Sequence, residues 1–258
     1  MHHAYIDKFA YQDSPIHRLD ARVKFVVVFA FTVLVLSVSR TSPAILSCYA
    51  VGPFVLLVLG RVPLKFAFKH TLVVSPFVLI LALTCPLYDR TPTVAAFGPI
   101  TIETTVGWLR CVTIMGKFVV TMLALIALVS TTRFNVLLAG LQKLLMPKIL
   151  VVQLGFLYRY IFVLVDRVQH MLRARAARKM RNLGFVVELR TAAAMVGALL
   201  LRSISNAENI SRAMRARGFD GNWRTISRFE IGFADVVFAA AAAAFMIALQ
   251  VLPGPAPH

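Results

Sequence analysis

The chain has 258 residues, of which 59% are hydrophobic and only 15% are charged. Soluble domains typically contain about 45–50% apolar and about 25% charged residues, so this composition excludes an ordinary soluble domain. Lys and Arg outnumber Asp and Glu by 28 to 11, which leaves a formal net charge of +17. In a polar chain such a charge would indicate nucleic-acid binding, but here the basic residues flank apolar segments. The composition therefore predicts a membrane protein with a basic cytoplasmic face.

Five apolar segments approach the roughly 20 residues that a helix needs to cross a bilayer. They cover about 23–39, 43–60, 69–88, 108–130 and 232–252. The first is the shortest, and it spans only if Arg22 and Lys24 extend their charged ends to the headgroups. The sequence thus predicts an all-α membrane protein with about five transmembrane helices, four N-terminal and one C-terminal.

Basic residues alternate between the connections as five spans require. Lys8 and Arg18 precede the first segment, only Arg40 follows it, and Arg61 and Lys65 follow the second. Residues 131–230 contain 17 Lys and Arg against five Asp and Glu. Because short cytoplasmic loops carry the Lys and Arg excess, we expect a cytoplasmic N-terminus and a C-terminus outside.

Residues 131–230 are too long and too regular to form a loop. Apolar residues recur at intervals of three and four from Ile149 to Val163 and from Val196 to Met214, as in amphipathic helices. A shorter helix from Phe134 to Met146 would end at Pro147. We expect about three helices at the cytoplasmic surface, because further spans would bury Arg159 or Arg202 at about 2.5–3.5 kcal/mol each. The predicted domains are therefore 1–130 (membrane helices 1–4), 131–230 (cytoplasmic helices) and 231–258 (last membrane helix and tail).

We find no catalytic constellation in the sequence. The segment from Gly107 to Lys117 has the wrong glycine spacing for a phosphate-binding loop, so we expect no ATP binding by this chain. Cys48, Cys85 and Cys111 suggest neither a disulfide framework nor a zinc site. His2 and His3 are adjacent, and a weak metal site or a mobile terminus would explain them. We expect no catalytic residue, bound cofactor or metal ligand.

Two ionisable residues, Lys117 and Asp235, fall inside predicted spans. Such residues are candidates for a transport path. We favour the alternative, in which Lys117 pairs or snorkels and Asp235 is hydrated near the interface. The alanine run 239–244 permits close helix approach. Ala239, Ala240 and Ala243 are therefore candidates for packing on another membrane subunit, and an internal helix crossing is an equal alternative.

Two arginine-rich motifs stand at predicted helix ends, at 173–179 and 212–219. In the second, Gly218 suits the left-handed position that ends a helix, and Arg217 is favoured by the helix dipole. Phe219 would then be an apolar side chain just beyond the end. Such an end suits an acidic groove on a partner, because guanidinium pairs with carboxylates. Composition alone favours the alternative, a basic surface with ordinary capping.

The stretch from Asp13 to Lys24 resembles the N-terminal signature of the cobalt-type (CbiQ-like) T component of energy-coupling factor transporters, with Ala21 where the family usually has Pro. Residues 157–160 (Leu-Tyr-Arg-Tyr) and both arginine motifs resemble this family as well. The resemblance implies a non-catalytic scaffold in the cytoplasmic membrane of a prokaryote. Its implied partners are two cytoplasmic ATPases that hold ATP and magnesium, a substrate-binding membrane S component (CbiM-like) and a small accessory membrane subunit (CbiN-like).

In that family, coupling helices end in Ala-Arg-Gly-like motifs that dock on the ATPases. By resemblance, Ala216, Arg217 and Gly218 match the second motif. The first falls on Ala177, Arg178 and Lys179, where Lys replaces Gly, and Arg175 marks an alternative register; Phe219 completes the set of candidate coupling residues. The resemblance favours import of cobalt, with a link to cobalamin biosynthesis; nickel or a vitamin are alternative substrates. A stand-alone secondary permease or ion channel is the alternative function.

Overall fold

The computed structural model describes residue 12 and residues 14–38, 43–89, 91–97, 100–144, 146–179, 184–221 and 232–251. Contacts divide the chain into two compact units, Met1–Gly140 with Ser227–His258, and Leu141–Ile226. The three-part division into residues 1–130, 131–230 and 231–258 stays a prediction. Gly140 of the predicted first cytoplasmic helix packs against Ala21 and Arg22, within the first unit.

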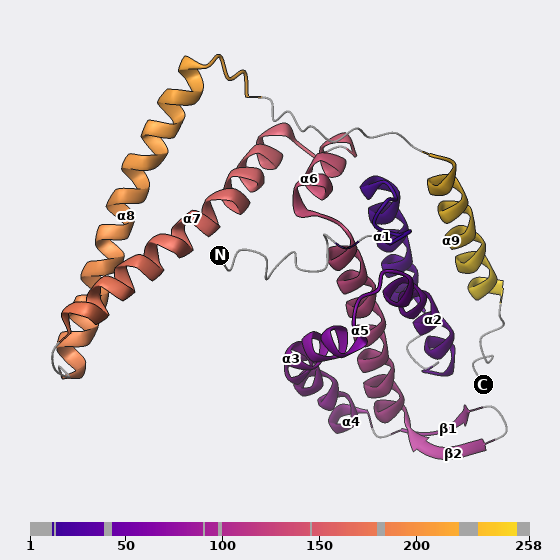
Figure 1. The fold of residues 1–258 in the computed structure, drawn as a ribbon. Helices are drawn as coiled ribbons and strands as arrows, with labels where there is room; N and C mark the ends of the chain where they lie inside the picture. The colour runs from indigo at the N-terminus through magenta and orange to yellow at the C-terminus, as the bar shows by residue number, and fades with distance from the viewer. Residues whose placement is uncertain are drawn as a thin grey trace. The chain divides into compact units, whose positions relative to one another are not determined.

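The described chain is predominantly helical (Figure 1). The first unit contains α1 (Ala21–Ser37), α2 (Pro43–Leu59), α3 (Leu64–Leu83), α4 (Cys85–Tyr88), β1 (Pro92–Phe97), β2 (Ile100–Thr105), α5 (Val106–Thr131), most of α6 (Phe134–Lys143) and α9 (Phe233–Val251). The second contains α7 (Lys148–Arg178) and α8 (Phe185–Ala216). The strands pair antiparallel, with Pro92 opposite Thr105 and Phe97 opposite Ile100. This hairpin is an addition to the predicted all-α class.

Each predicted apolar segment contains a helix. In the described residues, four stretches are long and apolar enough to cross a membrane: Leu64–Tyr88, Val106–Thr131, Lys148–Arg178 and Phe233–Val251. The chain is therefore a multi-pass membrane protein. Helices α1 and α2 have only 17 residues each, and α7, which we predicted outside the bilayer, is among the four. The count of five spans thus stays a prediction.

Helix α5 is the centre of the first unit, with α1, α2, α3 and α4 packed around it (Figure 1). One apolar cluster joins α1, α2, α5 and α9; its members include Val35, Tyr49, Ala124 and Leu249. A second cluster joins the end of α2 and the start of α3 to the second half of α5. Small residues permit this close packing, since a Cβ on Gly60 would lie 2.8 Å from Thr131 Cγ2.

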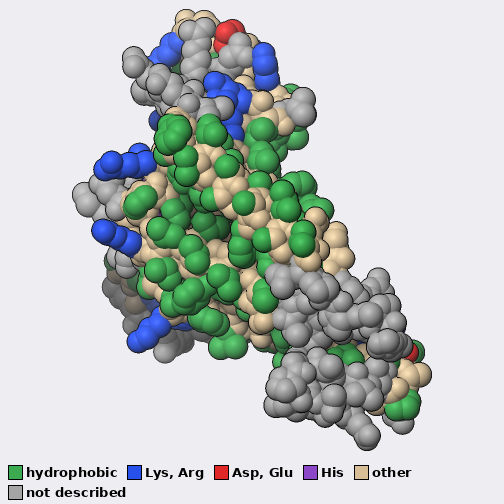
Figure 2. Space-filling model, turned by 90° about the vertical axis from the view of Figure 1, so that its right-hand side faces the viewer, with side chains coloured by type: hydrophobic (Ala, Val, Ile, Leu, Met, Phe, Trp, Pro, Cys, Tyr) green, Lys and Arg blue, Asp and Glu red, His purple; other side chains and the backbone are tan. Residues whose placement is uncertain are grey.

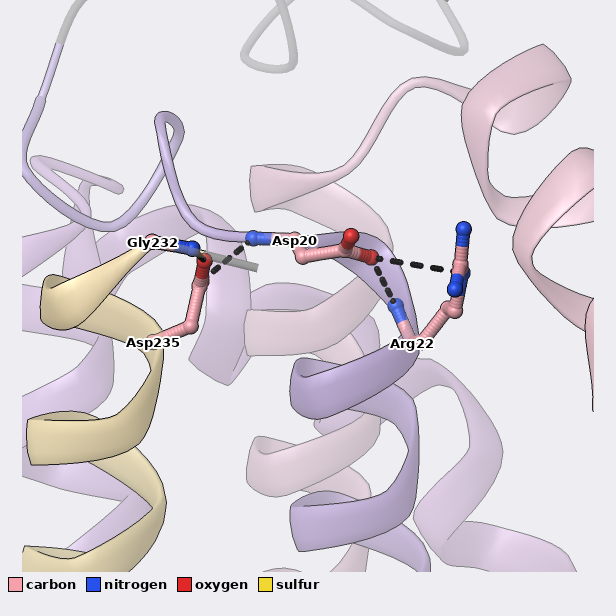
Figure 3. Close-up of polar contacts among 4 residues, drawn as sticks. All are labelled: Asp20, Arg22, Gly232 and Asp235. Carbon is pink, nitrogen blue, oxygen red and sulfur yellow. Dashed lines mark hydrogen bonds and ion pairs between the residues drawn. The ribbon is translucent and has the colours of Figure 1, made fainter. Parts of the chain in front are cut away.

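A buried polar cluster ties the start of α1 to the start of α9 (Figure 3). Asp20 caps α1 by accepting from the Arg22 N–H at 2.9 Å. The Asp235 carboxylate accepts from the Asp20 N–H at 2.7 Å and from the Gly232 N–H at 2.9 Å. The prediction that Asp235 is hydrated is therefore wrong, because the residue is only 5% exposed and its carboxylate joins two helix ends.

Lys24, in the first turn of α1, binds the C-terminal end of α5. Its Nζ donates to the Thr131 carbonyl at 3.1 Å, and the residue is only 4% exposed. A cation at the last carbonyls of a helix is favoured by the helix dipole. The condition that we set for the first span, in which Lys24 extends to the headgroups, is therefore wrong. The Thr131 carbonyl accommodates the charge inside the protein instead, and a span at α1 stays a prediction. Helix α1, α9 and the C-terminal end of α5 thus meet at one end of the unit.

Lys117 lies within α5 and closes the other end of α1. Its Nζ donates to the carbonyls of Leu36 at 2.9 Å and Val38 at 2.6 Å. The expectation that Lys117 pairs is confirmed, and its partners are the last carbonyls of a neighbouring helix, which lack partners within α1.

The outer surface of the first unit is apolar. Figure 2 views the side on which α9 lies in Figure 1, and hydrophobic side chains cover most of the described surface there. On α9, Val236, Val237 and Ile247 are each about half exposed or more. A contiguous surface of this kind suits contact with lipid.

Candidate functional site

The candidate coupling residues lie on the second unit, where α7 and α8 form a helical hairpin (Figure 1). The helices have 31 and 32 residues. Their patterns produce long amphipathic faces, as the spacing of their apolar residues predicts. The hairpin exposes a charged motif where each helix ends.

The first motif closes α7. The helix ends at Arg178, and the N–H of Lys179 donates to the Ala176 carbonyl at 3.3 Å. Ala177, Arg178 and Lys179 are exposed, and Arg175 is half-buried. Arg178, the coupling residue in the register that we prefer, is therefore exposed at the end of the helix.

Lys179, which replaces the usual glycine of the family motif, forms an ion pair with Glu188 in the first turn of α8. The bond from Lys179, followed by the nearby charges of Lys179 and Arg175, holds the pKa of the Glu188 carboxyl below its usual range. Because Lys179 precedes α8 and Glu188 lies within it, the pair joins the two helices at the turn. This pair was not predicted, although its opposite charges lie nine residues apart, between the two predicted helices, and were a usable signal.

The second motif closes α8 in a Schellman motif. The N–H of Gly218 donates to the Arg215 carbonyl at 3.0 Å, and the N–H of Phe219 donates to the Met214 carbonyl at 3.1 Å. Gly218 has φ +75°, so its predicted left-handed conformation is confirmed. Ala216, Arg217 and Gly218 are exposed, and Arg217 is the C-cap residue.

Phe219 is half-buried and lines a groove of about 460 Å³ between α7 and α8. Phe156, Tyr160 and Met214 line the same groove, which is mostly apolar, with Arg167 and Arg215 also contributing to it. Phe156 and Tyr160 stack with ring centroids 6.1 Å apart. The aromatic residue after the motif thus lines a groove of its own hairpin, whereas Arg217 is exposed.

The two motifs stand at opposite ends of α8. Glu188, which holds Lys179, and Ala216 are 28 residues apart, so the motifs are separated by about 42 Å at 1.5 Å per helical residue. One partner surface of ordinary size does not reach both ends, since a standard interface buries about 800 Å² on each side. The geometry therefore suits two separate docking contacts.

Large apolar side chains of α8 lie exposed from Phe185 to Ile204. No residue of α8 is buried within the described chain. Phe185 is 81% exposed and Leu201 is 69% exposed, and Val196, Leu200 and Ile204 are at least half exposed. An uncovered apolar surface of this extent indicates a protein or membrane contact.

The remaining predicted site residues lie elsewhere. Ala239 is half-buried on α9, and Ala240 and Ala243 are exposed. Their contact with another subunit stays a prediction. Among the described residues, no three His, Cys, Asp or Glu side chains are grouped to hold a metal ion. His2 and His3 lie outside the described residues.

The fold and the hairpin define a multi-pass helical membrane protein with an exposed basic helical pair. The family model of CbiQ, described as cobalt transport protein, matches residues 12–227, so the chain belongs to this family. It is an energy-coupling factor T component of the CbiQ-like type, and the resemblance recognised in the sequence is confirmed.

Several relatives match over most of the chain. An uncharacterized protein of Methanocaldococcus jannaschii is 26% identical over 91% of this chain and 81% of its own length. The energy-coupling factor transporter transmembrane protein EcfT of Listeria innocua is 26% identical over 94% of this chain and 92% of its own. The EcfT protein of Bacillus subtilis is 26% identical over 84% of each chain.

Proposed function

We propose that this chain is the coupling subunit of an ATP-driven importer, and that it transmits the motion of two partner ATPases to a substrate-binding membrane subunit. The main observation that supports this proposal is the pair of exposed arginines, Arg178 and Arg217, at opposite ends of one helical hairpin. Guanidinium groups bind carboxylates in a fixed fork, so each end suits an acidic groove on a separate ATPase.

The hairpin has the properties that transmission requires. Movement of one end reaches the other only through a stiff element, and α7 and α8 are continuous over 31 and 32 residues. The Lys179–Glu188 pair and the Schellman motif hold the two ends in defined geometry. The exposed apolar face of α8 offers the surface on which the membrane subunit rests.

The hairpin lies on the cytoplasmic side in this proposal. The chain leaves α5 and enters α9 at the same end of the first unit, since Lys24 binds Thr131 and Asp20 binds Asp235. The segment between them therefore crosses the membrane an even number of times. Helix α7 is apolar enough to cross, but α8 is not among the candidate spans in the described residues. Two crossings would require α8 to cross together with α7, so we infer zero crossings, with spans at α1, α2, α3, α5 and α9.

The orientation follows from the basic residues, which favour a cytoplasmic N-terminus and a C-terminus outside. ATP and magnesium belong to the ATPases in this proposal, and this chain binds no cofactor and catalyses no reaction. The family description supports cobalt as the substrate, with nickel as the alternative. The substrate is held by the partner membrane subunit, with a small accessory subunit beside it.

Charge reversal at the two helix ends tests the coupling role. The variants Arg178→Glu and Arg217→Glu each place a carboxylate in an acidic groove, so we expect each to lower ATPase co-purification and cobalt uptake at least tenfold. Arg202→Glu is the matched control, because Arg202 is exposed on α8 away from both ends. It makes the same charge change and should retain both properties.

Full ATPase association and full uptake in the Arg178→Glu, Arg217→Glu double variant would refute the coupling role. Uptake by the purified chain in vesicles that contain no ATPase would favour a stand-alone permease. In the Lys179→Gly variant, retained uptake would show that the first contact does not need the Lys179 side chain.

A further inference from the structure

Helix α4 is packed unusually closely on the first turns of α5. A Cβ on Gly107 would lie 2.5 Å from the Asp89 carbonyl oxygen, 2.6 Å from Pro86 Cα and 2.8 Å from the Cys85 carbonyl oxygen. Glycine is therefore required at this position, because any side chain would overlap the α4 backbone. An ion pair between Arg110 and Asp89 holds the same two segments together.

Cys85 and Cys111 lie on the two sides of this junction. Cys111 follows Gly107 by four residues and therefore shares its helix face. Helical side chains incline toward the N-terminus of their helix, so the Cys111 thiol is directed toward the turn that α4 covers. The backbone of Cys85 lies against Gly107 in that turn. Both cysteines are half-buried, whereas Cys48 is exposed on α2.

The junction is remote from the end of the unit where α1 and α9 begin. Cys111 lies 20 residues before Thr131, which is about 30 Å along α5, or the thickness of a bilayer core. In the orientation proposed above, on which this step rests, the junction faces the extracytoplasmic side. That compartment permits disulfides, unlike the cytosol.

We propose that Cys85 and Cys111 are a redox pair that forms an intrachain disulfide and clamps α4 to α5. One thiolate attacks the disulfide of an external oxidant, which forms a mixed disulfide and releases one thiol. The second cysteine attacks the mixed disulfide and releases the second thiol. Two protein thiols are oxidised, one external disulfide is reduced, and the two released thiols take up the protons.

Oxidised glutathione is the test oxidant, applied to the reduced full chain in lipid nanodiscs. After an acid quench and denaturation, free thiols are counted by maleimide labelling and mass spectrometry. We expect one free thiol in the wild type, which is Cys48, and none in Cys48→Ser. Cys85→Ser and Cys111→Ser should form no intrachain disulfide. Three free thiols in the wild type, or a disulfide that includes Cys48, would overturn the proposal.

A register control tests the geometry. In the Cys111→Ser, Val112→Cys double variant the thiol moves to a neighbouring position that is 51% exposed and turned about 100° around α5. We expect its disulfide with Cys85 to form at least tenfold more slowly than the native pair. Equal rates would show that chance collisions join the thiols, and would overturn the assigned junction.

The side of the membrane is tested separately, in sealed vesicles of known orientation with impermeant oxidised glutathione. Oxidation from the extracytoplasmic face alone supports the proposal. Oxidation from the cytoplasmic face alone would overturn the extracytoplasmic position of the disulfide and the proposed topology. This holds even if the disulfide forms in nanodiscs. If no Cys85–Cys111 disulfide forms, but the Arg178→Glu and Arg217→Glu variants behave as expected, the disulfide proposal is wrong and the proposed function is unaffected.

Discussion

Asp235 joins two helices that are separated by most of the chain. Replacing it with Ala removes the acceptor of the Asp20 and Gly232 N–H groups in a buried place. A buried donor without a partner costs about 1–3 kcal/mol, so we expect Asp235→Ala to lower the melting temperature of the detergent-solubilised protein clearly. Asp235→Asn keeps one carbonyl oxygen and should lower it less.

Glu208→Ala serves as the control for this prediction, because Glu208 is an exposed carboxylate on α8. It should melt like the wild type. If Asp235→Ala also melts like the wild type, the link between α1 and α9 does not stabilise the fold.

The sequence predicted local features of single residues better than distant ones. The left-handed Gly218 follows from a local rule about helix ends, and it was predicted correctly. Asp20, which binds Asp235, and Thr131, which binds Lys24, lie 215 and 107 residues away from their partners. No spacing rule reaches so far, so hydration and snorkelling were the expectations, and both were wrong.

At the scale of the helix, α8 offers a matched pair of glycines. Gly218 has φ +75°, where a Cβ costs about 1–2 kcal/mol, so Gly218→Ala should unwind the last turn. Gly197 lies inside the helix with open space around it, and Gly197→Ala should stabilise α8 by about 0.8–1.0 kcal/mol. Hydrogen exchange along α8 measures both effects, and equal responses would contradict the assigned helix end.

The turn between α7 and α8 should respond to acid. The lowered pKa of Glu188 means that its pair with Lys179 stabilises the turn above the ordinary carboxyl pKa. The stabilisation is lost as the pH falls through the lowered value. Hydrogen exchange in the first turn of α8 should therefore be slower in the wild type than in Glu188→Gln at neutral pH, and the two should converge in acid. A difference that persists in acid would exclude the ion pair as its cause.

Helices with clear periodicity were predicted, including the short α6, whereas the two strands were not. The apolar spacing of α7 and α8 predicted both helices, and each apolar segment of the first unit contains a helix. The hairpin of β1 and β2 was missed, because two strands of six residues between long apolar segments give a weak signal. The candidate site was found through the arginine motifs, whereas the Lys179–Glu188 pair needed the turn geometry.

For the whole molecule, the side of the membrane on which the helical hairpin of α7 and α8 lies decides between two topologies. If α7 crosses, Gly184 lies outside; if α7 and α8 both stay on the cytoplasmic side, it lies inside. In a cysteine-free background, Gly184→Cys and Thr91→Cys place single thiols at exposed positions between α7 and α8 and before β1. An impermeant maleimide added outside intact cells should label position 91 and leave position 184 unlabelled until the membrane is opened. Labelling of both positions from outside would contradict the cytoplasmic placement of the hairpin. Because α5 ends and α9 begins at one end of the first unit, α8 would then have to cross the membrane together with α7.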